Sequence, residues 1–76
     1  MPSEYLMQIG GIVKSKRLAL GLTQKELEDR SSVTQSMISK IEGGSADNVS
    51  IEILRKLAKA LECVLVDLLP EEDKGR

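Results

Sequence analysis

The segment from Thr23 to Glu42 constrains the fold most, because it contains two helix-start signals in close succession. Thr23 is followed three residues later by Glu26, a spacing at which the two side chains can each satisfy a free backbone amide of the first helical turn. Thr34 can cap a second helix with its hydroxyl, and that helix ends at Glu42 before two glycines. The pattern therefore predicts two short helices joined by a tight turn.

The rest of the chain also favours helices. Apolar residues at helical spacing predict a first helix over residues 3–20 and a fourth over residues 50–61. Gly10 and Gly11 weaken the first helix, so it could begin after them. Because Tyr5 is the only aromatic residue, the core must be aliphatic, which suits a helical bundle better than a sheet.

The end of the chain is ambiguous in its secondary structure. The short apolar run of residues 63–69 fits either a fifth short helix or a strand that pairs with a second subunit, and Pro70 ends it in both cases. Residues 70–76 form an acidic tail that is expected to be disordered, and residues 1–8 are an N-terminal extension or the start of the first helix. The sequence thus predicts one all-α domain over residues 9–69.

Composition argues against several classes of function. The chain has 76 residues, no histidine and one cysteine, so an imidazole-based catalytic triad, a zinc site and an internal disulfide are not expected. That cysteine, Cys63, lies in an apolar segment without an evident activating base, which argues against an enzyme. The sequence has no signal-peptide core and no apolar run of membrane-spanning length. We therefore expect a cytoplasmic protein with no membrane partner, no cofactor, no metal and no small-molecule ligand.

The charge distribution does not by itself indicate nucleic-acid binding. The net charge is −1, from eleven basic and twelve acidic residues, so a bulk positive field is absent. Residues 1–40 hold six basic and four acidic side chains, and residues 41–76 hold five and eight. A nucleic-acid partner must therefore be argued from individual side chains in the first half of the chain.

The second helix of the predicted pair has a face rich in hydrogen-bonding groups, opposite its apolar residues. The Gln35 side-chain amide can form two hydrogen bonds with adenine, at N6 and N7. Lys40 can donate a hydrogen bond to guanine or to a phosphate. Ser36 and Ser39 can serve base edges or the DNA backbone. At the start of the first helix, Gln24 and the free amides beside it suit a phosphate. Further candidates for phosphate contacts, which are otherwise ordinary solvated side chains, are Thr23, Lys14, Lys16 and Lys25.

Over residues 9–69 the chain resembles the Cro and phage-repressor type of helix-turn-helix proteins. The blocks that carry the likeness are VKSKR with LGL, TQKEL, TQSMISKIEGG, and LAKAL followed by the ending Asp67, Leu68, Leu69. The resemblance implies a compact five-helix, lambda-repressor-like domain that dimerises and places its third helix in the major groove of a near-palindromic DNA operator. It also implies a bacterial or phage transcriptional regulator.

The same resemblance assigns roles to single residues. Gln24 would bind phosphate and brace Gln35, while Arg17 and Glu42 would form a partly buried ion pair that ties the first helix to the third. The positions that contact bases and the DNA backbone in the family are occupied here by Thr34, Gln35, Ser36, Ser39 and Lys40.

The chain departs from the family pattern around the turn. Glu28 stands where the family usually has a small residue between the two helices, so its carboxylate needs a polar partner. Ser31 and Ser32 stand where the family usually has an apolar residue and then glycine, which predicts a serine at positive φ. The loop of residues 45–49 has no basic residue, so we expect fewer phosphate contacts than in relatives and a modest affinity.

A further departure concerns the predicted fifth helix. Leu65 stands where relatives commonly have a helix cap, and Leu68 is also apolar. We expect these two leucines to form a dimer interface, through packing of the fifth helix or through a strand between subunits. The alternative is that they complete the core of a monomer.

Two functions remain open from the sequence. The first is a sequence-specific DNA-binding transcriptional regulator, a repressor or autoregulator that binds its operator as a homodimer. The second is an antitoxin or adaptor whose main role is to bind a partner protein such as a toxin. The net charge and the loop without basic residues favour the second slightly.

Overall fold

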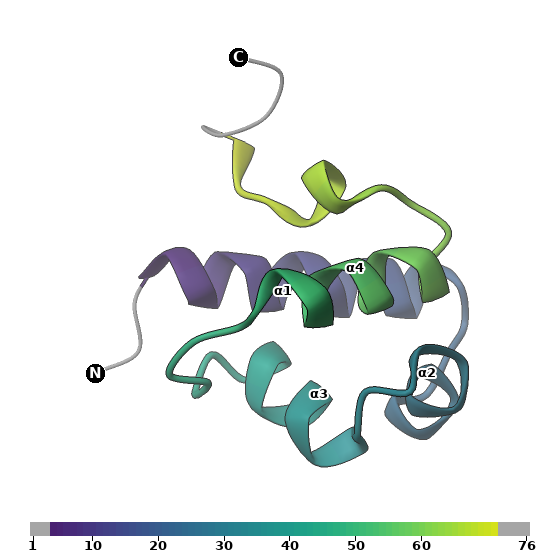
Figure 1. The fold of residues 1–76 in the computed structure, drawn as a ribbon. Coiled ribbons are helices and arrows are strands. Elements are labelled where there is room, and N and C mark those ends of the chain that lie inside the picture. The colour runs from purple at the N-terminus through teal and green to yellow at the C-terminus, as the bar shows by residue number, and fades with distance from the viewer. Residues whose placement is uncertain (1–3, 72–76) are drawn as a thin grey trace.

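The computed structural model describes residues 4–71, which form a bundle of helices (Figure 1). The α-helices are α1 (Glu4–Ala19), α2 (Gln24–Ser31), α3 (Gln35–Glu42) and α4 (Ile51–Ala60), and a short 3-10 helix, η1 (Leu65–Leu68), comes last. α1 packs against α3, α2 packs against both α3 and α4, and η1 packs on α4 and α1. The predicted all-α class is confirmed.

The expected five-helix domain has four α-helices, and the segment predicted as a fifth short helix or an intersubunit strand forms only the 3-10 helix η1 within the described residues. The chain reverses at Glu62, whose φ is 62°, and the Asp67 carboxylate then accepts a hydrogen bond from the amide of Val64 at 3.2 Å. Leu69 is already extended, with φ −89° and ψ 153°, as residues before proline prefer to be. Between this reversal and Pro70 there is room only for a single 3-10 turn.

The core is aliphatic, as expected from the single aromatic residue. Burying each large aliphatic side chain contributes about 1.5 to 3 kcal/mol, so the core provides most of the favourable free energy of folding. The largest completely buried side chains are Ile9, Val13, Leu27, Ile38, Ile41, Leu57 and Leu68.

Leu68 is one of these core residues, with an exposed fraction of 0%. Its side chain completes the core, which is the alternative expected for this leucine, and a part for Leu68 in a dimer interface stays a prediction. The physical reason is that η1 packs on α4 and α1, which encloses this side chain within its own subunit. Leu65 is half-buried against the same core, and its predicted role stays open.

α1 runs without interruption through Gly10 and Gly11, so the alternative that it begins after them is wrong. A Cβ atom at Gly10 would clash with the carbonyl oxygen of Ile41 and would lie 3.0 Å from its carbonyl carbon. Glycine is therefore needed at residue 10 because the backbones of α1 and α3 approach each other closely there. Residue 3, at which the first helix was expected to begin, lies outside the described residues.

The turn between α2 and α3 contains the strained serine that the sequence predicts. Ser32 adopts the left-handed conformation, with φ 65° and ψ 15°, and its amide donates to the carbonyl of Glu28 at 2.9 Å. Ser31 is buried, and its hydroxyl accepts a hydrogen bond from the Val33 amide at 3.1 Å. Glu28 has the polar partner it needs, because its carboxylate lies 3.5 Å from Lys25 Nζ.

Ser32→Gly is expected to raise the free energy of unfolding by about 0.5 to 1 kcal/mol, since glycine adopts positive φ without the penalty of a Cβ atom. Urea denaturation followed by circular dichroism measures the change. Ser15→Gly is the matched control, because the same replacement inside the exposed face of α1 should lower stability by about 0.5 to 1 kcal/mol. A loss of stability in Ser32→Gly would contradict the strain at this residue.

The ordered chain continues past the predicted end of the domain at residue 69. Pro70 is buried and Glu71 is exposed. Residues 72–76 of the predicted tail lie outside the described residues. Between residues 4 and 71 no helix has both the length and the apolar composition required to cross a membrane.

Candidate DNA-binding surface

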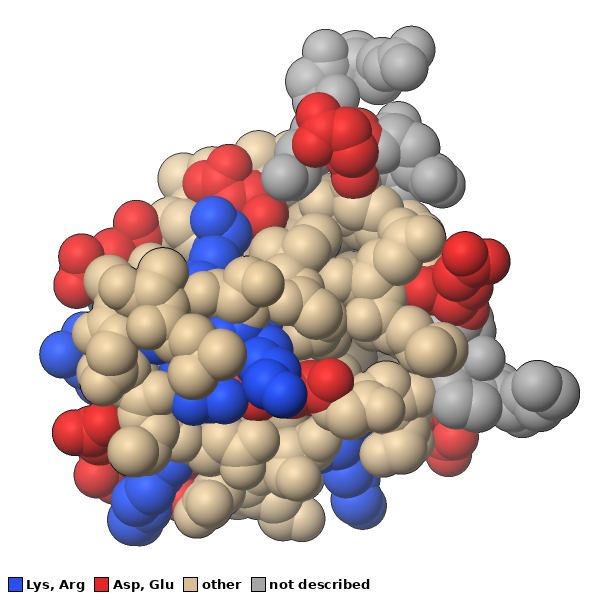
Figure 2. Space-filling view, turned by 180° about the vertical axis from the view of Figure 1, so that it is seen from behind, with Lys and Arg blue, Asp and Glu red and all other residues tan. Residues whose placement is uncertain are grey.

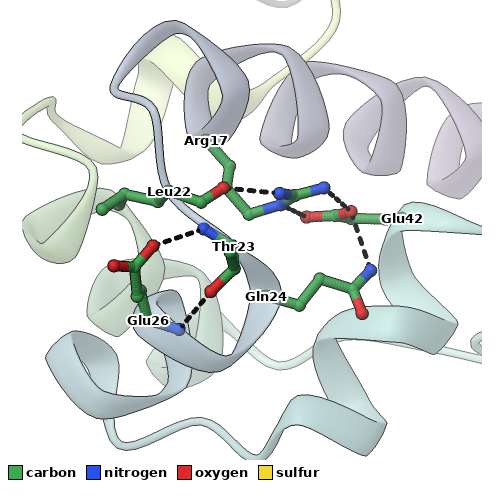
Figure 3. A network of polar contacts seen from close by, with 6 residues as sticks. All are labelled: Arg17, Leu22, Thr23, Gln24, Glu26 and Glu42. Carbon is green, nitrogen blue, oxygen red and sulfur yellow. Dashed lines mark hydrogen bonds and ion pairs between the residues drawn. The ribbon is translucent and has the colours of Figure 1, made fainter.

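The start of α2 is fixed by a reciprocal pair of hydrogen bonds (Figure 3). The Glu26 amide donates to the Thr23 hydroxyl at 3.0 Å, and the Thr23 amide donates to the Glu26 carboxylate at 2.8 Å. The amides of Gln24 and Lys25 precede the first possible intrahelical acceptor, so they remain free to bind an anion. The Thr23 hydroxyl keeps its own hydrogen, which can still be donated to a phosphate oxygen.

α3 has one apolar side, which is buried, and one polar side, which is exposed. Ile38 and Ile41 are buried, and Thr34 caps the helix by accepting a hydrogen bond from the Met37 amide at 3.1 Å. The exposed residues recur at intervals of one and four, so they share one face of the helix. The structure thus brings together on one exposed surface the predicted contact residues Thr34, Gln35, Ser36, Ser39 and Lys40.

The predicted ion pair between α1 and α3 is present (Figure 3). Arg17 donates from Nε to Glu42 Oε2 at 2.7 Å and from Nη2 to Glu42 Oε1 at 2.9 Å. A third bond, from Nη1 to the Leu22 carbonyl at 2.6 Å, ties the α1–α2 connection to the same guanidinium. The side chains of Arg17 and Glu42 are only 9% and 3% exposed. The hydrogen bonds to Glu42 raise the pKa of Arg17 despite the opposing effect of burial, so the guanidinium remains charged.

Gln24 joins this network instead of bracing Gln35. Its Nε2 donates to Glu42 Oε1 at 3.1 Å, and no hydrogen bond links it to Gln35 among residues 4–71 (Figure 3). A carboxylate is the stronger acceptor because charge-assisted hydrogen bonds exceed neutral ones in strength, so Gln24 lies against Glu42 and the predicted Gln24–Gln35 contact is not formed here. The signal that could have revealed the Gln24–Glu42 bond was the ion pair itself, since a bidentate carboxylate still has lone pairs for another donor.

The lysines do not form one basic surface. Lys25 Nζ lies 3.5 Å from Glu28 and 3.6 Å from Asp29, and Asp29, followed by Glu28, raises the pKa of Lys25. Lys14 is exposed and makes no ion pair within the described part of the chain, while Lys16 is half-buried. In the face seen in Figure 2, basic and acidic side chains are interspersed. Contacts with DNA would therefore depend on individual donors more than on a broad positive field.

Cys63 does not have the surroundings of a nucleophile. Partial burial raises the pKa of its thiol, while nearby Lys16 has the opposite effect. A raised pKa keeps the thiol protonated, and the thiolate is the reactive form. Within residues 4–71 no group of three or more cysteine and carboxylate side chains could hold a metal ion.

Two capped short helices, the second of which has a polar outer face, define a helix-turn-helix protein. The sequence model of the helix-turn-helix family matches residues 13–68, so the chain belongs to this family of DNA-binding transcriptional regulators, which are not enzymes. The chain is 36% identical over 64 residues to the HTH-type transcriptional regulator SlrR of Bacillus subtilis (strain 168). That match covers 84% of this chain but only 42% of SlrR, so the chain spans less than half the length of this relative.

Solved structures show the same fold. The restriction-modification controller protein C.AhdI from Aeromonas hydrophila is 33% identical, with a TM-score of 0.80 over 84% of this chain and 96% of that chain. A chain of the SinR protein/SinI protein complex is 31% identical, with a TM-score of 0.79 over 90% of this chain and 66% of that chain.

Proposed function

We propose that this protein regulates transcription by binding a specific, near-palindromic DNA operator as a homodimer, with α3 in the major groove, and that it acts as a repressor or autoregulator. The observation that carries the proposal is the exposed polar face of α3 beside the free amides at the start of α2. The similarity to a transcriptional regulator and to a restriction-modification controller protein supports it.

Base reading would come from the exposed face of α3. Gln35 has an amide that can pair with adenine N6 and N7, and Lys40 has an ammonium group that can donate to guanine O6 and N7. Ser36 and Ser39 lie between them and would donate to base edges or phosphates, and the Thr34 hydroxyl would reach the backbone. These side chains have no large role in the core, which leaves them available to DNA.

Phosphate binding would come mainly from uncharged donors. The Gln24 and Lys25 amides, strengthened by the positive end of the α2 dipole, can hold a phosphate without a formal charge. The Thr23 hydroxyl and Lys14 would add contacts beside them. Because few phosphates are neutralised by lysines, the affinity should fall with salt less steeply than for a strongly basic protein.

The homodimer in this proposal is supported by apolar side chains near the end of the described chain. Val64 and Val66, on either side of the half-buried Leu65, are 61% and 39% exposed. A second copy packed on residues 64–66 would remove this apolar surface from water, which favours association. Two copies related by a twofold axis would then present their α3 helices to successive major grooves.

Gln35→Ala is expected to weaken binding to a duplex from the protein's own promoter region by about tenfold or more, because a bidentate base contact contributes about 1 to 3 kcal/mol. A band-shift titration at moderate salt measures the change. Gln8→Ala is the matched control, since Gln8 is an exposed glutamine on α1, outside the helix-turn-helix. Equal affinities of the two variants, or no preference of the unaltered protein for its promoter, would contradict the proposed function.

A second candidate is an antitoxin or adaptor that mainly binds another protein. The similarity to a chain solved in the SinR protein/SinI protein complex favours it, as do the exposed valines near η1. Under this alternative the protein would co-purify with the product of a neighbouring gene at a fixed stoichiometry, whether or not Gln35 is replaced.

A further inference from the structure

The loop after α3 closes a hollow beside the end of this helix. The hollow has a volume of about 310 Å³ and lies between α3 and the first residues of the loop. Its apolar floor comes from Met37 and Ala46. Polar side chains complete the lining, which consists of Lys40, Ser45, Asp47 and Asn48.

The backbone donors of this region are already used. The amides of Gly43, Gly44 and Ser45 donate to the α3 carbonyls of Ser39, Ile41 and Lys40, at 2.9, 3.1 and 2.9 Å. They complete the end of the helix and are not available to a phosphate. At residues 43–45, only side chains therefore remain available to DNA.

Two opposite charges line this hollow without contact between them. Lys40 and Asp47 are both exposed, and neither takes part in an ion pair within 4.0 Å among residues 4–71. The Asp47 carboxylate therefore keeps its full charge toward solvent.

We propose that Asp47 lowers the affinity of this protein for DNA by repelling the phosphates that flank the carboxyl end of α3. The inference rests on the proposed function, in which α3 occupies the major groove. A recognition helix reads bases mainly with its first residues, so the loop after its last turn lies nearer to the backbone that walls the groove. Asp47 also offsets the attraction that Lys40 exerts on the same phosphates, because both side chains border one hollow.

Replacement of Asp47 by asparagine tests the inference, since it removes the charge and keeps the shape. Fluorescence anisotropy with a duplex from the protein's own promoter region measures the dissociation constant at several salt concentrations. We expect the dissociation constant of Asp47→Asn to be about two- to fivefold lower than that of the unaltered protein at about 50 mM salt. The difference between the two proteins should be smaller at about 200 mM salt. Thermal unfolding should be unchanged, because no hydrogen bond or ion pair of Asp47 occurs within residues 4–71.

Glu62→Gln is the matched control for charge. It changes the net charge equally, and it follows the last turn of α4, whereas Asp47 precedes the first turn; the ten residues of α4 span about 15 Å. Glu62 also lies 3.7 Å from Arg30, but both side chains are exposed, so the loss of this pair should have little effect. Equal affinities of Asp47→Asn and Glu62→Gln would overturn the inference. Weaker binding by Asp47→Asn would also overturn it and would mean that Asp47 accepts a hydrogen bond from a base amine.

The failure of this inference can be distinguished from the failure of the proposed function. If the unaltered protein binds the promoter duplex and Gln35→Ala does not, the proposed function stands whatever Asp47→Asn does. If the unaltered protein shows no preference for the promoter duplex, the proposed function is contradicted, and the inference that rests on it is contradicted as well.

Discussion

Arg17→Met will lower the free energy of unfolding by about 3 to 4 kcal/mol, because it leaves the carboxylate of Glu42 buried without its ionic partner. The Glu42 side chain is only 3% exposed, so water cannot replace the guanidinium. The Leu22 carbonyl loses its donor at the same time. For a domain of this size, such a loss is a large part of the total stability. Urea denaturation followed by circular dichroism measures it.

Arg30→Met provides the matched control for this prediction. Arg30 Nη1 lies 3.7 Å from Glu62 Oε2, and the two side chains are 49% and 68% exposed. Solvent screens such a pair, so its loss should cost no more than about 0.5 kcal/mol. Equal losses in the two variants would show that burial does not determine the strength of the Arg17–Glu42 pair. The double replacement Arg17→Met with Glu42→Met should recover part of the loss, because no unpaired charge then remains buried.

Gly10→Ala should lower the free energy of unfolding by about 2 to 3 kcal/mol, since its methyl group would overlap the backbone of Ile41 and force α1 away from α3. A backbone carbonyl cannot rotate aside as a flexible side chain can, so the helices must shift. The displacement would also disturb the neighbouring Arg17–Glu42 pair, which joins the same two helices. Denaturation by urea gives the difference in stability.

Gly11→Ala is the internal control, and the opposite sign is expected. A Cβ atom at Gly11 would meet no atom within 4 Å, so the alanine would only improve helix propensity, by about 0.5 to 1 kcal/mol. If both alanine variants were stabilised, α1 and α3 would not approach as closely as the structure indicates.

Structural features were predictable from the sequence where the interacting residues lie within a few positions of one another. The caps formed by Thr23 and Thr34 depend on amides three residues along the chain, and the strain at Ser32 depends on the local turn. Such signals can be recognised without knowledge of the tertiary structure. The boundaries of α2 and α3 were therefore predicted closely.

The sequence was less informative where packing between distant segments decides the structure. The role of Gly10 depends on Ile41, which is remote in sequence, and Leu68 became a core residue because η1 packs on α4 and α1. Only the family resemblance indicated the Arg17–Glu42 pair, since no local spacing links two residues 25 positions apart. The Gln24–Glu42 bond was missed for the same reason.

The two sides of α3 separate folding from recognition. Ile38 and Ile41 hold the helix in the core and Glu42 anchors its last turn, whereas Gln35, Ser39 and the other outward side chains are exposed. Substitutions on the outward side therefore carry little thermodynamic penalty for the domain. Under the proposed function, a lineage of such proteins would change its preferred DNA sequence by replacing a few outward residues of α3, while selection for stability acts on a different set of positions.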